Sequence, residues 1–70
     1  MSPRTPRLTA KQVIKQLKKA GFIKIGQTGS HQKLFNRKTR RTAIVPIHNS
    51  KIIPLGTLKA IEKQAGVFFN

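Results

Sequence analysis

Apolar residues near the start of the chain recur at the spacing of a helix. They fall at positions i, i+3, i+4 and i+7, which places them on one helical face: Ala10, Val13, Ile14 and Leu17. Thr9 is a favourable N-cap, and Gln12 three residues later completes a capping-box pattern. Gly21 is placed to end the helix. The pattern therefore predicts a first helix between Thr9 and Gly21.

The middle of the chain has the alternation and residue types of strands. Three such runs, at residues 22–27, 31–35 and 42–47, are separated by a turn signal at 28–30 and a polar, basic loop at 36–41. Pro46 indicates an edge position or the end of the third strand. A second helix follows, with Pro54 in its first turn and Gly66 at its end. Its predicted apolar stripe is Leu55, Leu58, Ile61 and Ala65.

This order of elements predicts an α+β fold with the sequence αβββα. The simplest way to bury both helical stripes is a three-stranded antiparallel sheet with both helices on one face. The second face of the sheet and the basic hairpin then stay free for a ligand. Residues 1–8, which include Pro3 and Pro6, are predicted to form a flexible basic N-terminal arm, and residues 9–70 a single domain.

The charge of the chain narrows the choice of partner. Fifteen Lys and Arg residues stand against a single acid, Glu62, which gives a formal net charge of +14. We expect Glu62 on a solvated helix face, paired with one base such as Lys59 or Lys63, so most cations need an external anion. Nucleic acid and acidic protein fit this need. A membrane fits it poorly, because no apolar run approaches the roughly 20 residues of a spanning helix, and we expect a cytoplasmic protein.

Few side chains could carry out catalysis. With no Cys and no pair of carboxylates, the chain offers neither a thiolate metal site nor two-carboxylate chemistry, and we expect no cofactor and no metal. Acid–base chemistry by His31 or His48, helped by Lys and Arg, remains. RNA suits so small a set because its ribose 2′-hydroxyl supplies the nucleophile. The expected products are a 2′,3′-cyclic phosphate and a 5′-hydroxyl, and DNA should not be cleaved.

Strand geometry brings the two histidines to one end of the predicted hairpin. Alternation puts His31, Lys33 and Phe35 on the same face of the second strand. If the basic loop pairs residue 36 with residue 41, His31 lies opposite Pro46 and His48 lies opposite residue 29, which makes His48 a candidate catalytic helper. A histidine at the start of a strand is also typical of an ordinary hydrogen-bonded surface residue, and the residues alone leave that alternative open.

Several residues are candidates for contact with the RNA backbone. Four bases in the loop at 36–41 have no acid nearby and are expected to touch an anion, although a solvated turn is the alternative. A glycine in the turn permits a close approach of the backbone, and the serine beside it can donate a hydrogen bond to phosphate. The predicted RNA-binding set is Lys24, Gly29, Ser30, Lys33, Arg37, Lys38, Arg40 and Arg41. We expect the phenylalanines to be mostly core, with base stacking by Phe35 as an alternative: Phe22, Phe35, Phe68 and Phe69.

An ordered set of motifs resembles the HicA family of bacterial and archaeal mRNA interferase toxins. The resemblance runs from about Thr9 to Val67 and rests on five segments: Lys19-Ala20-Gly21-Phe22, Gly29-Ser30-His31, Val45-Pro46-Ile47-His48, Gly56-Thr57-Leu58 with Ile61, and Gln64-Ala65-Gly66. It implies a fold like that of double-stranded-RNA-binding domains and cleavage of mRNA that does not require the ribosome. It also implies that His31, in the Gly-Ser-His turn, is catalytic.

The resemblance also implies a partner. The family's antitoxin, HicB, binds the toxin and covers its active face, and an acidic antitoxin is what the uncompensated charge calls for. The basic segment from Ser2 to Arg7 is not part of the family pattern, and the resemblance gives His48 a motif position but no role.

Two other functions fit parts of the sequence. A non-catalytic RNA- or DNA-binding module would use the same cations, and only His31 in its motif separates it from a nuclease. A membrane-active basic peptide would need a long amphipathic helix, which the β-rich middle and its glycines at positions 21, 26 and 29 oppose.

Overall fold

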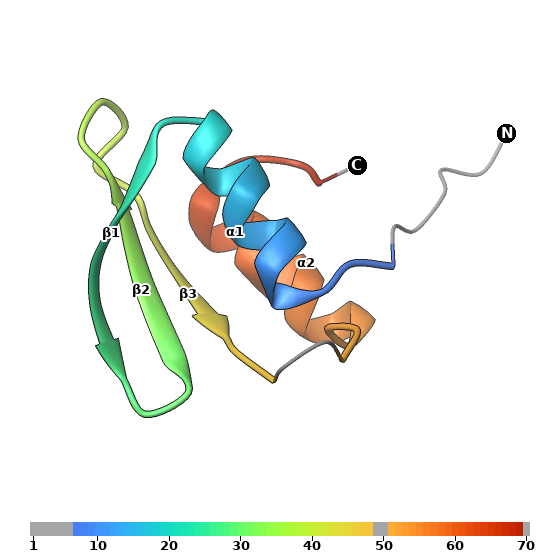
Figure 1. Ribbon diagram of the computed structural model, residues 1–70. Helices are drawn as coiled ribbons and strands as arrows, with labels where there is room; N and C mark the ends of the chain where they lie inside the picture. The colour runs from blue at the N-terminus through green and yellow to red at the C-terminus, as the bar shows by residue number, and fades with distance from the viewer. Residues whose placement is uncertain (1–6, 49–50, 70) are drawn as a thin grey trace, which may run out of the picture.

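A computed structural model describes residues 7–48 and 51–69 of the chain. The predicted order of elements is confirmed, with two helices and one three-stranded antiparallel sheet in the order αβββα (Figure 1). Both helices lie on the same side of the sheet. The elements are α1 (Ala10–Lys19), β1 (Phe22–Thr28), β2 (His31–Asn36), β3 (Thr42–Pro46) and α2 (Leu55–Ala65).

Helix α1 begins with the predicted capping box. The Gln12 N–H donates to the Thr9 hydroxyl at 3.3 Å, and the Thr9 N–H donates to the Gln12 side-chain oxygen at 2.9 Å. These bonds satisfy two backbone donors that a helix start leaves without an intrahelical partner. The chain leaves the helix through Gly21, whose φ of 102° suits glycine. The apolar face of α1 buries Ala10, Val13 and Leu17 against the sheet and α2.

The strand order in the sheet is β1-β2-β3. The register predicted for the second hairpin is confirmed, because His31 pairs with Pro46 and the Asn36 N–H donates to the Arg41 carbonyl at 2.9 Å. The first hairpin departs from regular alternation: the pairing shifts between Lys24 and Gly26, which leaves Ile25 as the extra residue of a β-bulge.

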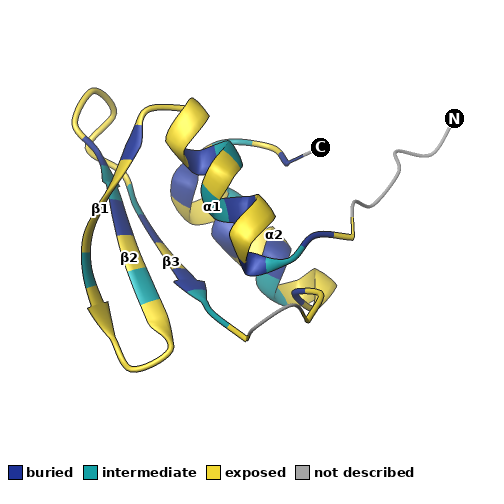
Figure 2. Cartoon of the chain, in the orientation of Figure 1, coloured by how far each residue is buried: buried dark blue, intermediate teal, exposed yellow. Residues whose placement is uncertain are grey.

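The core lies between the sheet and the two helices. Leu34, Ala43 and Val45 are fully buried from the sheet side, and α2 contributes Leu58 and Ile61. Figure 2 shows buried and exposed residues following one another along the strands, as expected when only one face is covered. Helix α2 ends at Gly66, which takes the left-handed conformation with φ of 72°.

Three expectations about packing are wrong in detail. Leu55 was expected in the buried stripe of α2 but is exposed at the first residue of the helix, and the buried side of α2 starts at Leu58. Phe22 and Phe69 are core residues, whereas Phe68 is exposed. The Glu62 carboxylate accepts a hydrogen bond from the Phe69 N–H at 2.8 Å and is half-buried, so it anchors the C-terminal tail rather than standing on a solvated face.

The N-terminal segment joins the core earlier than predicted. Residues 1–6 of the predicted arm lie outside the described residues, but Leu8, its last residue, is buried. The Leu8 carbonyl accepts a hydrogen bond from the Ile53 N–H at 2.8 Å, and Thr9 forms an isolated β-bridge with Ile52. Within the described part of the chain, neither helix has the length and apolar character needed to cross a membrane.

Candidate active site

The turn between β1 and β2 presents the Gly-Ser-His segment at one end of the sheet. Thr28 pairs with His31, so Gly29 and Ser30 form a two-residue hairpin loop. Such loops need a residue with positive φ, and Gly29 supplies it with φ of 57°. The Gln27 side-chain amide donates to the Gly29 carbonyl at 3.2 Å and holds the turn. Ser30 and His31 are both exposed, as a residue that meets substrate must be.

His31 and Lys33 lie on the face of the sheet that carries no helix. Thr28, His31 and Pro46 form one cross-strand row on this open face, and Gly26, Lys33 and Ile44 form the next. Both rows belong to the face opposite the buried Leu34. A shallow depression of about 360 Å³ spans the two rows, lined by Gly26, Gln27, Thr28, His31, Lys33 and Ile44. The predicted juxtaposition of an imidazole and an ammonium on one face is confirmed.

His48 lies at the same end of the β2–β3 hairpin as His31. The Ile47 N–H donates to the Ser30 carbonyl at 2.6 Å, which extends the contact between the strands one residue beyond the His31–Pro46 pair. His48 follows directly and is exposed. Its pairing with Gly29 is not part of the sheet register and stays a prediction.

The basic hairpin lies at the other end of β2. Asn36 lies five residue steps along β2 from His31, which corresponds to about 17 Å of strand. Arg37, Lys38 and Arg40 in this loop are exposed, so they are positioned for phosphates several nucleotides away from a phosphate bound at His31. The structure therefore divides the predicted RNA-binding set between two ends of one strand.

Asn36 organises the basic hairpin, and sequence reasoning missed it. It is 4% exposed, and its side-chain oxygen accepts hydrogen bonds from the Lys38 N–H at 2.9 Å and the Thr39 N–H at 3.2 Å. Its amide nitrogen donates to the Ala20 carbonyl at 3.1 Å. One buried amide thus ties the hairpin to the end of α1. An Asn at the start of a loop is the signal that could have indicated this role.

Two of the predicted RNA-binding cations point elsewhere. The Arg41 guanidinium packs on the end of α2: its Nη1 is 3.5 Å from the carbonyl oxygens of Lys63 and Gln64, and a Cβ atom on Gly66 would come within 2.8 Å of its Nε. Lys24 is exposed but pairs with Leu34, so alternation places it on the helix-bearing side of the sheet. Both placements depend on packing and register that composition does not show.

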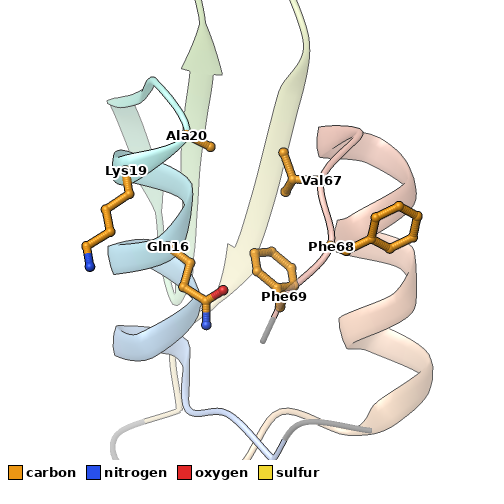
Figure 3. Close-up of a pocket in the computed structure, with 6 residues that line it drawn as sticks. All are labelled: Gln16, Lys19, Ala20, Val67, Phe68 and Phe69. Atoms are coloured by element: carbon orange, nitrogen blue, oxygen red, sulfur yellow. The ribbon is translucent and has the colours of Figure 1, made fainter. Parts of the chain in front are cut away.

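A larger depression, of about 510 Å³, lies between the end of α1 and the C-terminal tail (Figure 3). The Phe69 ring turns inward between the two helices, whereas the Phe68 ring points away from α1. The lining contains no histidine, and its single ionisable side chain is that of Lys19. It therefore offers no acid–base pair and is a weaker candidate for catalysis than the smaller depression at His31.

Comparison with known proteins agrees with the motif resemblance. No curated protein matches the chain. The family model described as the HicA toxin of bacterial toxin–antitoxin systems matches residues 10–67, which span both helices and the whole sheet. This chain therefore belongs to the HicA toxin family.

Proposed function

We propose that this toxin is an endoribonuclease that cleaves mRNA as a single strand, without a metal ion and without the ribosome. The observation that carries the proposal is the position of His31, which is exposed on an uncovered sheet face beside Lys33 and shares a depression with it. The substrate supplies the nucleophile, so the protein has only to move protons and stabilise charge.

In the proposed reaction the ribose 2′-oxygen attacks the neighbouring phosphorus and the bond from phosphorus to the 5′-oxygen breaks. The proton of the 2′-hydroxyl goes to a base, and the leaving 5′-oxygen receives a proton from an acid. His31 performs one of these transfers, and His48 is the candidate for the other, because both lie at the same end of the hairpin. The Lys33 ammonium binds a non-bridging phosphate oxygen and stabilises the charge that develops there.

The positions of the exposed cations indicate where the rest of the RNA backbone lies on the protein. The Gly29–Ser30 turn brings a backbone and a hydroxyl group close to the phosphate at His31. The exposed cations of the basic hairpin, Arg37, Lys38 and Arg40, contact the strand about 17 Å further along β2. Since each phosphate contact releases counterions, RNA affinity should fall steeply as salt is added.

Membership of the HicA family implies a HicB antitoxin as cognate partner. We propose that this antitoxin is acidic and covers the open face of the sheet. The charge supports the first point, because the only acid of the chain, Glu62, is occupied by the C-terminal tail. The exposed apolar side chains of the open face, Ile23 and Ile44 among them, support the second. We propose that the toxin acts in the cytoplasm, where mRNA is found.

A cleavage assay tests the proposal. The full chain, purified beside its antitoxin and then freed from it, is incubated with labelled single-stranded RNA in excess EDTA. We expect cleavage that leaves cyclic-phosphate ends, and no cleavage of a DNA strand of the same sequence. Intact RNA with tight, salt-sensitive binding would instead identify a non-catalytic nucleic-acid-binding module and overturn the nuclease.

A further inference from the structure

Gly26 occupies a position in β1 where nothing in the fold requires a glycine. Its φ is not positive, since the glycines with positive φ among the described residues are Gly21, Gly29 and Gly66. A Cβ atom at position 26 would have no atom within 4 Å apart from those of its two chain neighbours. Glycine inside a strand weakens it, and such a residue often marks a place where a ligand approaches closely. The neighbouring bulge does not account for it, because this backbone conformation is open to other residues.

The missing side chain leaves space on the open face beside the candidate catalytic residues. Gly26, Lys33 and Ile44 form one cross-strand row, and the depression of about 360 Å³ lies over it. Ile44 is 41% exposed and contributes an apolar wall. Gln27 also borders the depression, but it pairs with Gln32, which pairs with the buried Val45, so alternation directs the Gln27 side chain to the helix-bearing side.

We propose that this depression is a nucleobase subsite, formed by the surface of Gly26 and Ile44. The inference rests on the proposed function in taking single-stranded nucleic acid as the ligand. A base presents a flat apolar face, which matches the apolar floor formed where position 26 lacks a side chain beside Ile44. Lys33, in the same row, binds the phosphate of the same nucleotide.

The position of the subsite links base binding to the site of cleavage. The Gly26–Lys33–Ile44 row is one row away from His31, which corresponds to about 7 Å along the strand. A base seated over Gly26 therefore belongs to a nucleotide next to the phosphate at His31. The fit of the base to this depression then selects which phosphate is presented for cleavage, and Gly26 and Ile44 are specificity-determining residues.

Binding to uncleavable strands tests the subsite independently of catalysis. The two probes are a mixed-sequence single strand of eight deoxynucleotides and an abasic strand with the same number of phosphates. Neither carries a 2′-hydroxyl, so the result does not depend on whether the protein is a nuclease. The key variant is Gly26→Val, which fills the depression with a residue that strands favour and should fold at least as stably as the wild type.

We expect the wild type to bind the mixed-sequence strand about tenfold more tightly than the abasic strand. In Gly26→Val this preference should fall to near parity through weaker binding of the mixed-sequence strand, with affinity for the abasic strand unchanged. Ile23→Ala is the matched control, because Ile23 is exposed on the same face of the same strand but does not line the depression, and it should keep the preference.

Each other pattern contradicts the subsite. If the wild type binds both strands with equal affinity, the bases contribute nothing to binding and there is no base subsite. A Gly26→Val variant that keeps the full preference shows that bases bind elsewhere, and one that loses affinity for both strands equally shows that position 26 contacts the backbone. The cleavage assay described above decides the nuclease separately, since it uses RNA and a different readout.

Discussion

The two faces of strand β2 differ in burial, in hydrogen bonding and in the charge they carry. On one face Leu34 is fully buried, and the Asn36 side chain is satisfied at both its oxygen and its nitrogen. On the other face His31 and Lys33 are exposed beside a depression. The helix-bearing face holds the molecule together. The open face carries no helix, so its residues are available for binding and catalysis, and substitutions should separate the two roles.

The largest stability effect is expected on the buried face. Leu34→Ala should lower the free energy of unfolding by about 2–5 kcal/mol, because it removes apolar contacts and leaves a cavity among the core residues. Its neighbour on the open face is the matched control, and Lys33→Ala should change stability by no more than about 0.5 kcal/mol. Urea denaturation of both variants measures this. Equal losses would show that the open face is also structural.

A smaller loss is expected where the buried face ends in the basic hairpin. Asn36→Ala removes three hydrogen bonds and should lower stability by about 1–3 kcal/mol, because the Ala20 carbonyl loses its partner in a partly buried place. Amide exchange of Lys38 and Thr39 should quicken in this variant. Thr39→Ala, which removes one exposed hydrogen bond to the Arg41 N–H, is the control and should cost less. Unchanged exchange at Lys38 would contradict the organising role of Asn36.

The salt dependence of RNA binding should distinguish two exposed strand lysines on opposite faces. Lys33→Ala should flatten the slope of log affinity against log salt by about 0.7, the value for one lost phosphate contact on a single strand. Lys24→Ala should leave the slope unchanged, because Lys24 lies on the helix-bearing side. Titrations at several salt concentrations, with RNA whose 2′-hydroxyls are methylated and which therefore cannot be cleaved, measure both. A flattened slope for Lys24→Ala would extend the RNA surface around the β1 edge.

The smallest effect separates the cations of the hairpin itself. Arg41→Ala should lower stability by about 0.3–1 kcal/mol, because the guanidinium lies on the carbonyl end of α2, and should leave the salt slope of RNA binding unchanged. Arg37→Ala should leave stability nearly unchanged and should flatten the salt slope of RNA binding. Denaturation and binding measurements on the same two variants decide the point. If Arg41→Ala flattened the slope instead, this side chain would turn toward RNA.

Local rules were enough to predict much of this fold. The Thr9 and Gln12 side chains carry the signal for the start of α1 themselves, and the length of the basic loop fixes the pairing of His31 with Pro46. Alternation then puts Lys33 on the face of His31. The catalytic role of His31 itself stays a prediction.

Features that depend on contacts between distant parts of the chain were not predictable in the same way. The bulge at Ile25 changes which residues of β1 reach the open face, and the alternation around Lys24 in the sequence does not indicate it. Arg41 meets α2 across more than twenty residues of chain, and Glu62 meets the tail only because the tail folds back. The depression at His31 depends on three strands in register, so the sequence does not indicate its other lining residues, Gly26, Gln27, Thr28 and Ile44.

The most direct test of the catalytic role of His31 is the single-turnover rate at which the His31→Ala variant cleaves RNA at saturating concentration. Saturation removes differences in affinity, so the rate reports the chemical step. We expect a rate at least about 100-fold below that of the wild type, with RNA affinity and unfolding free energy nearly unchanged. A variant that cleaves at the wild-type rate, or whose loss of cleavage disappears once RNA is saturating, would show that His31 only binds RNA.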